Sequence, residues 1–366
     1  MRQGWFDTWK GGGTMGWTPL PIGIENYAEM IEKGYYYVDK TLFIKELLDR
    51  KGKVNLFTRP RRFGKTLNMS MLQYFFEKSE RDHTPLFTGT KIMKAGEKYV
   101  SEMGRYPVIF LSLKSMKQDN YSSAFYCLKD EYDVPLENAY FHGFYDRMAG
   151  LIRSLFESVL KTNNALEFAV ITGCLRISRK SIFTGLNNLN IISIMDNSYA
   201  EHFGFTQEEV DTMLSFYHLE SKRDSVKKWY DGYRFGDTEV YNPWSIICYV
   251  DSCYKNPDAL FKPYWSNTSS NSIVRTLVDR ADLSVRQEIE SLIAGHTIFK
   301  PVHEDITYED MDSTQDHLWN FLFFTGYLKK IRQIQQEEDI LWKCPFPTSR
   351  FATFTKILYF AGLKNQ

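Results

Sequence analysis

Apolar and polar positions follow a regular pattern over the first half of the chain. Short continuous apolar runs predict three buried strands, at residues 54–58, 107–113 and 166–172. Apolar residues at helical spacing predict helices between them, at residues 42–48, 67–76 and 144–160. Asp39-Lys40-Thr41 is expected to open the first helix and Gly52 to end it. Short strands alternating with helices favour an α/β layer with a parallel sheet.

The pattern changes beyond about Met195, where helical stretches surround an aromatic, turn-rich segment at residues 229–246. Thr206 followed by Glu209 has the spacing of a capping box, which predicts a helix start. The aromatic residues of 229–246 are expected to form core and turns rather than a platform on which bases stack. This half of the chain therefore predicts a second, mainly helical domain, for which a winged-helix-like form is one option.

The run RPRRFGKT, Arg59 to Thr66, stands between the first predicted strand and the helix that follows it. A strand, a turn ending Gly-Lys-Thr and a helix are the layout of a phosphate-binding loop, whose pattern is G-x-x-x-x-G-K-[ST]. Arg59 takes the place of the first glycine. We expect this to be tolerated if Arg59 keeps a negative φ, and Pro60 favours extended backbone there.

This P-loop interpretation assigns ATP and Mg²⁺ as ligands. Backbone N–H groups and the helix N-terminus would hold the phosphates. Lys65 would bind the β and γ phosphates, and the Thr66 hydroxyl would bind magnesium. Arg61 and Arg62 would add positive charge beside Phe63, and Gly64 would let the backbone approach closely. The alternative is a basic loop that only caps a helix.

A P-loop enzyme also needs acidic residues at the end of a neighbouring strand. The candidates are Asp130, as a magnesium ligand, and Glu131, which would activate water. The spacing is unfavourable, because the stretch after Leu113 is shorter than a parallel crossover needs. The alternative is a helix that begins after Ser122. Thr172, at a predicted strand end, and Arg176 are further candidates for contact with the γ phosphate or attacking water.

Composition and charge limit the number of domains, the kinds of partner and the cellular compartment that we expect. The chain has 366 residues, enough for two or three domains, and its formal net charge is zero, which gives no support for a chain-wide nucleic-acid or membrane surface. The five cysteines form no C-x-x-C pair, and no apolar run is long enough for a membrane helix. We therefore expect a cytoplasmic protein with free thiols and no membrane contact.

Several stretches together resemble the bacterial AAA-ATPase-like family, whose members usually carry a PD-(D/E)XK nuclease-like domain after the P-loop domain. They span about residues 20 to 330: LPIGIENYAEMIEKGYYYVDKTLFIKELLD, LFTRPRRFGKTLNMSMLQYFF, DEYDVPLENAY, AVITGCLRISRKSIFTGLNNL, EHFGFTQEEV, WYDGYRFGDTEVYNPWSI, YWSNTSS and FLFFTGYLK. The resemblance makes Arg59 normal for the family. It implies nucleotide and magnesium at Lys65 and Thr66, an acidic strand at 130–133, and a sensor region at Thr172 and Arg176.

The chain departs from the resembled family in two places. The family has a longer segment, including the apolar strand with the acidic pair, where this chain runs directly from CLKDE into YDVPL. We hypothesise an internal deletion near residue 131. The stretch from Cys344 has no family counterpart, and a frameshift near Lys343 would explain it.

The predicted organisation is a flexible leader at 1–17, a P-loop NTPase-like domain with a parallel sheet flanked by helices at 18–195, the mainly helical domain at 196–335, and an aberrant or truncated tail at 336–366. The leading functional hypothesis is an ATP-binding protein with little or no hydrolysis. The alternatives are a nucleic-acid- or protein-binding module with nucleotide as a conformational ligand, and a non-functional remnant of an ATPase–nuclease fusion. No nuclease activity is expected.

Overall fold

The computed structural model describes most residues between Thr18 and Pro345. The described residues are 18–111, 136, 139–140, 142–161, 163–174, 182–183, 186–264, 282–302, 315–336 and 339–345. The chain divides into two compact units, each described here by itself. The first comprises Met1–Lys51 and Gly64–Phe110, and the second comprises Gly52–Phe63 and Leu111–Gln366. The predicted boundary near residue 195 stays a prediction.

The first unit is helical in the part that is described. Its elements are α1 (Tyr27–Glu32), α2 (Leu42–Arg50), α3 (Lys65–Phe76), α4 (Thr84–Phe87), a 3₁₀ turn (Ile92–Lys94) and α5 (Glu97–Val100). Tyr27 lies fully buried at its centre, where its ring packs against Phe87 with 5.0 Å between centroids. The Tyr27 hydroxyl donates to Leu86 O at 3.0 Å and its backbone N–H donates to Ser70 Oγ at 2.9 Å, so this one residue joins α1 to α3 through its backbone and to α4 through its side chain.

Helix α2 begins where the sequence predicted. Asp39 Oδ1 accepts hydrogen bonds from the backbone N–H and the hydroxyl of Thr41, at 2.9 and 2.6 Å. Asp39 Oδ2 accepts from the backbone N–H of Lys91 at 2.7 Å. The helix ends at Arg50, and Lys51 adopts the left-handed conformation that terminates many helices. Asp39 therefore anchors the start of α2 to a distant turn.

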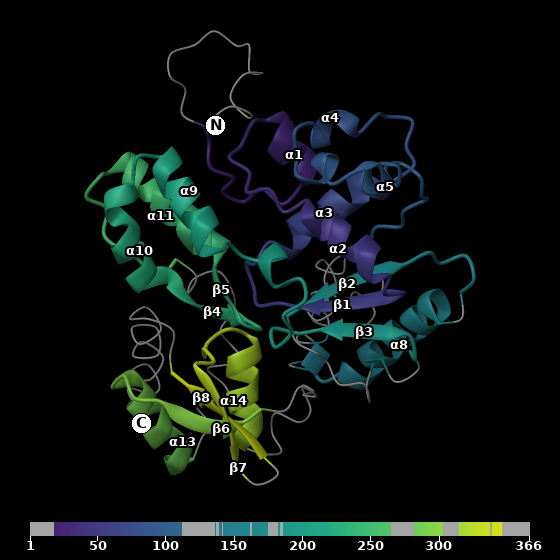
Figure 1. Cartoon of the computed structure of the whole chain (residues 1–366). Coiled ribbons are helices and arrows are strands. Elements are labelled where there is room, and N and C mark those ends of the chain that lie inside the picture. The colour runs from purple at the N-terminus through teal and green to yellow at the C-terminus, as the bar shows by residue number, and fades with distance from the viewer. Residues whose placement is uncertain are drawn as a thin grey trace. The chain divides into compact units, whose positions relative to one another are not determined.

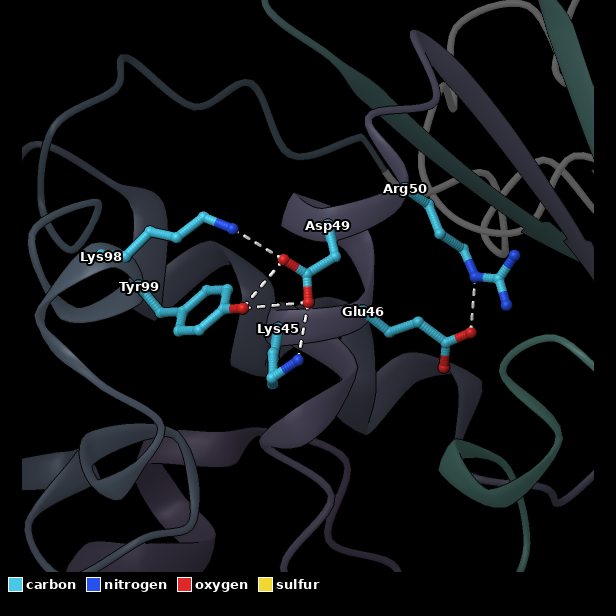
Figure 2. A network of polar contacts seen from close by, with 6 residues as sticks. All are labelled: Lys45, Glu46, Asp49, Arg50, Lys98 and Tyr99. Carbon is cyan, nitrogen blue, oxygen red and sulfur yellow. Dashed lines mark hydrogen bonds and ion pairs between the residues drawn. The ribbon is translucent and has the colours of Figure 1, made fainter.

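A polar network on the outer surface of the first unit joins α2 to α5 (Figure 2). Asp49 accepts from Lys45 Nζ at 2.6 Å, from Lys98 Nζ at 2.9 Å and from the Tyr99 hydroxyl at 2.8 Å. The hydrogen bond from Lys45, then those from Lys98 and Tyr99, hold the pKa of the Asp49 carboxyl well below its usual range. Glu46 and Arg50 form a separate pair beside it, at 2.7 Å.

Replacing Asp49 by asparagine is expected to make the stability of the protein less sensitive to acid. Because the pKa of Asp49 is lower in the folded state, its contribution is present above the unfolded value of about 3.9 and is lost as the pH falls below it. The difference in urea midpoint between wild type and Asp49→Asn should therefore be present at pH 7 and shrink below pH 4. Glu46→Gln serves as the charge-matched control. A difference that stays constant down to pH 2 would contradict this role.

The second unit contains a parallel sheet of three strands, β1 (Val54–Thr58), β2 (Ala169–Gly173) and β3 (Leu189–Ile192), in the order β2-β1-β3 (Figure 1). All five residues of β1 are buried, as expected for a central parallel strand. Helix α8 (Tyr145–Leu160) precedes β2, and Leu160 O accepts from Asn188 Nδ2 just before β3, at 3.1 Å. This confirms the predicted α/β layer with a small parallel sheet flanked by helices.

The strand predicted at residues 107–113 is wrong for the part that is described. Residues 107–111 form no strand, and the side chains of Ile109, Phe110 and Leu111 are exposed. Only the residue before them, Tyr106, makes an isolated parallel bridge, to Glu77. A continuous apolar run predicts burial, but a strand forms only where a neighbouring strand takes up its backbone hydrogen bonds. The rest of the predicted strand, and the alternatives for 122–131, lie outside the described residues.

The remainder of the second unit mixes helices with antiparallel strands. Its helices are α9 (Gln207–Phe216), α10 (Arg223–Tyr230), α11 (Pro243–Lys255), α13 (Leu283–Ile293) and α14 (Gln315–Phe324), with 3₁₀ turns at Ala200–His202 and Glu220–Lys222. Its strands are β4 (Asp231–Phe235), β5 (Thr238–Tyr241), β6 (Ile298–Pro301), β7 (Arg332–Gln336) and β8 (Asp339–Cys344). The predicted mainly helical region thus also carries two antiparallel sheets, β4-β5 and β6-β8-β7. Whether it is winged-helix-like stays a prediction.

Local patterns explain several of these elements. Thr206 Oγ1 accepts from Glu209 N at 3.3 Å and Glu209 Oε2 accepts from Thr206 N at 2.8 Å, which confirms the predicted capping box of α9. The turn-rich aromatic segment forms the β4-β5 hairpin, and its Tyr233 and Phe235 are buried, as expected for core. β8 lies within the predicted tail and pairs with both β6 and β7. Residues 346–366 lie outside the described part.

Candidate phosphate-binding loop

The segment that follows β1 contains two residues with a left-handed backbone. Arg62 has φ 69°, and Gly64, the N-cap of α3, has φ 79° and ψ 13°, so both are left-handed. A left-handed residue turns neighbouring backbone N–H groups toward a common side, which is how anion-binding nests form. Helix α3 then begins at Lys65 and contributes its positive end. The loop predicted between strand and helix is therefore present, with the strand and helix bounds close to those expected.

The Arg59 side chain is hydrogen-bonded to the ends of two strands, β1 and β3. Its side chain is fully buried, and Nη1 donates to Thr58 O and to Ile192 O, both at 3.0 Å. The guanidinium also lies 5.2 and 5.0 Å from the ring centroids of Phe203 and Phe235. Burial lowers the pKa of Arg59 to about 9, with Asp196 opposing the shift, so the group stays charged at neutral pH. Its φ is not positive, as the sequence analysis required.

Three further loop residues, Arg61 to Phe63, each contact a residue from a distant part of the second unit. Arg61 O accepts from Asn242 Nδ2 at 3.3 Å. The Arg62 guanidinium lies 4.5 Å from the ring centroid of Trp244. The Phe63 side chain is buried against Tyr233, with 4.8 Å between centroids and 76° between planes. Of Phe63, therefore, only the backbone is available to a phosphate.

Lys65 and Thr66 are the first two residues of α3. Lys65 is buried, with 4% of its surface exposed, and Thr66 is half-buried. Apart from its chain neighbours and its own helix, no described residue has a heavy atom within 4 Å of the place where a Cβ on Gly64 would stand, so no described side chain fills the space beside the helix start. The first helical hydrogen bond runs from Asn68 N to Gly64 O at 3.0 Å. The predicted phosphate contact of Lys65 and magnesium contact of Thr66 stay predictions.

The carboxyl ends of β1 and β2 meet beside the loop. Thr172 pairs with Phe57, and Thr58 pairs with Gly173, whose carbonyl accepts from Arg59 N at 3.0 Å. Thr58 Oγ1 is buried, and within the described part of the chain it has no hydrogen-bond partner. A buried hydroxyl without a partner is costly, and it stands one residue before the loop. Thr172 therefore lies at the same sheet edge as the loop, one residue before the end of β2, and its contact with a phosphate or water stays a prediction.

Three other predicted site residues, Asp130, Glu131 and Arg176, lie outside the described residues. So does the implied acidic strand at 130–133. Among the residues that are described, no group of three or more His, Cys, Asp or Glu side chains is placed to hold a metal ion. Of the two predicted magnesium ligands, Thr66 is described and Asp130 is not.

Sequence reasoning missed the set of residues that encloses the loop. These residues are Gly204, Tyr233, Phe235, Asn242 and Trp244. A Cβ on Gly204 would stand 2.9 Å from Phe63 Cδ1, and one on Gly326 would stand 3.1 Å from Pro60 Cβ, so both positions require a residue without a side chain. The one local signal was Asn242 before Pro243, which is typical of a helix start. Nothing local indicated that the same amide reaches Arg61.

The fold and this loop define a class: an α/β protein in which the central strand of a small parallel sheet runs into a phosphate-loop-like turn and a helix. The part of the chain that holds this loop is similar to the AAA-ATPase-like family. Residues 21–125 and 118–183 match that family's model, which is described as "Predicted AAA-ATPase".

A curated relative is the "Uncharacterized protein in vnfD 5'region" of Azotobacter chroococcum mcd 1. It is 30% identical over 363 residues, an alignment that takes in 87% of this chain and 65% of the relative's length. The chain therefore spans less than two thirds of that relative. No solved structure matches the chain. Within the described residues, no helix is long and apolar enough to cross a membrane.

Proposed function

We propose that the chain binds ATP at residues 59–66. The observation that carries this proposal is the backbone between β1 and α3, where the left-handed Arg62 and Gly64 lead directly into the helix start. Backbone N–H groups of Arg62 to Thr66 would donate to the phosphate oxygens, and the Lys65 ammonium would balance their charge. Arg61 and Arg62 would add positive charge at the rim. The match of residues 21–183 to the model described as "Predicted AAA-ATPase" supports a nucleotide as the ligand.

Magnesium belongs to the same proposal. When bound, the ion would neutralise charge on the phosphates. The Thr66 hydroxyl would hold it, and Asp130 would be its carboxylate ligand in a site with the acidic strand in place. In such a site Glu131 would orient water, and Thr172 and Arg176 would contact the terminal phosphate or the water. Thr172 already lies at the sheet edge beside the loop.

We further propose that ATP is bound with little turnover, because a segment carrying the acidic strand is missing. The two family-model matches overlap at residues 118–125, which supports a break in the correspondence there. The alignment with the Azotobacter protein runs over 363 positions yet takes in 87% of this chain, so it includes positions without a counterpart here. The exposed apolar residues 109–111 also fit a missing neighbouring strand.

The hydrolysis rate tests this second part. With excess ATP and Mg²⁺, phosphate release by purified protein should stay below about 0.01 per second, against about 1–1,000 per second for typical enzymes. Raising the Mg²⁺ concentration further or replacing Mg²⁺ with Mn²⁺ should not raise the turnover, because the proposed missing element is a segment of the protein. Turnover of one per second or more that is lost in Glu131→Gln would show that the acidic residues are in place, and would overturn the proposed deletion. A protein or nucleic-acid partner, and the remnant hypothesis, stay predictions.

A further inference from the structure

The loop proposed to bind phosphate contains a residue in a conformation that its type disfavours. Arg62 has φ 69°, in the left-handed region where side chains with a Cβ are strained and glycine is not. The neighbouring left-handed residue, Gly64, carries no such strain. A loop with an arginine at this place therefore needs contacts that hold it, or it will spend part of its time in other conformations.

Trp244 provides such a contact. The Arg62 guanidinium lies 4.5 Å from the Trp244 ring centroid, within the range of a cation–π interaction, for which tryptophan is the strongest partner. Both side chains are half-buried, so the contact is partly withdrawn from water. The ring belongs to the first turn of α11, whose position is fixed by the buried Asn242 before it.

Asn242 holds the peptide just before Arg62. Its Oδ1 accepts from Ser245 N at 3.1 Å and so caps α11, while its Nδ2 donates to Arg61 O at 3.3 Å. In a trans peptide the carbonyl of one residue and the N–H of the next point in opposite directions. Holding Arg61 O toward Asn242 therefore turns the N–H of Arg62 away from α11, and a phosphate on that side would meet a donor.

We infer that Asn242 and Trp244 are positioning residues for the nucleotide: they keep the backbone of Arg61 and Arg62 in the phosphate-binding form. The inference rests on the proposed function and deepens it, because it places part of the affinity for ATP in residues about 180 positions beyond the loop. Neither side chain touches the phosphate. Each acts by raising the fraction of the protein whose loop is ready to bind.

Binding of ATP to matched variants by calorimetry tests this. Trp244→Ala is expected to weaken ATP binding about tenfold, and Trp244→Phe, which keeps an aromatic face, about threefold or less. Asn242→Asp keeps the acceptor that caps α11 but replaces the N–H donor by an oxygen facing Arg61 O. It should weaken binding by about tenfold or more. In an Arg62→Gly background, Trp244→Ala should weaken ATP binding about threefold or less, because glycine adopts the left-handed form unaided and no longer depends on the Trp244 contact.

The control is Thr206→Ala, which removes the cap of α9 and leaves the contacts of Asn242 and Trp244 in place. It should lower stability while leaving ATP affinity unchanged, and every variant is compared at a temperature where circular dichroism shows it folded. If Asn242→Asp does not fold, the ATP affinities of Trp244→Ala and Trp244→Phe test the inference by themselves. If wild type binds ATP and Trp244→Ala binds it with the same affinity, the inference is overturned and the proposed function still stands. No ATP binding by wild type overturns both.

Discussion

Replacing Arg59 by glycine, the residue that the standard phosphate-loop pattern has there, is expected to destabilise the protein by about 3 kcal/mol or more. The side chain is fully buried, and its Nη1 bridges the last carbonyl of β1 and the last carbonyl of β3. Removing it leaves a large cavity between Phe203 and Phe235 and takes the donor from two carbonyls. Glycine adds a further loss of about 0.5–1 kcal/mol through its greater freedom in the unfolded chain.

Urea unfolding measures the effect, with Arg61→Gly as the matched control. Arg61 is half-buried, and its hydrogen bond from Asn242 uses the backbone carbonyl, which the substitution keeps. Arg61→Gly should therefore lose clearly less unfolding free energy than Arg59→Gly. Arg59→Lys should recover only part of the stability, because an ammonium lacks the planar face that lies between the two rings. If Arg59→Gly proves as stable as wild type, or binds ATP more tightly, the claim that Arg59 stabilises the fold is wrong.

Elements set by local patterns were predictable from the sequence. β1 forms at Val54–Thr58, α3 ends at Phe76 as expected, and Thr206 and Glu209 form their capping box. In each case the signal lies within a few neighbouring residues: an apolar run, an apolar periodicity or a cap. The strand, turn and helix around residues 59–66 were predictable for the same reason, since their pattern is contiguous.

Features that depend on distant partners were not predictable. Residues 107–111 have the composition of a buried strand but no neighbouring strand among the described residues, so they are exposed. β3 was missed because its four residues, of which Asn190 is exposed, give a weak local signal, and only pairing with β1 defines it. The roles of Asn242 and Trp244 were missed because the loop that they hold lies far away in the chain.

Lys65→Ala is expected to weaken ATP binding by about 10- to 100-fold. A charge-assisted contact with phosphate contributes about 1.5–3 kcal/mol, and each 1.4 kcal/mol corresponds to a factor of ten in affinity. Lys65 is the second to last residue of the Gly-Lys-Thr run and the first residue of α3, and it is buried beside the open space at Gly64. Alanine has a high helix propensity, so the substitution should leave α3 intact.

Lys78→Ala is the matched control, because it removes the same charge from an exposed position just beyond the end of α3. Its ATP affinity should equal that of wild type. Thr66→Ala should reduce affinity chiefly when Mg²⁺ is present, which would separate the proposed metal contact from the phosphate contact.

Equilibrium dialysis of labelled ATP against wild type, Lys65→Ala and Lys78→Ala tests the central claim most directly. The account predicts saturable binding at one site in wild type and in Lys78→Ala, and a loss of about 10-fold or more in Lys65→Ala. Saturable binding of equal strength in all three proteins would place the nucleotide elsewhere. Absence of binding in folded wild type would contradict the claim that residues 59–66 form a nucleotide site.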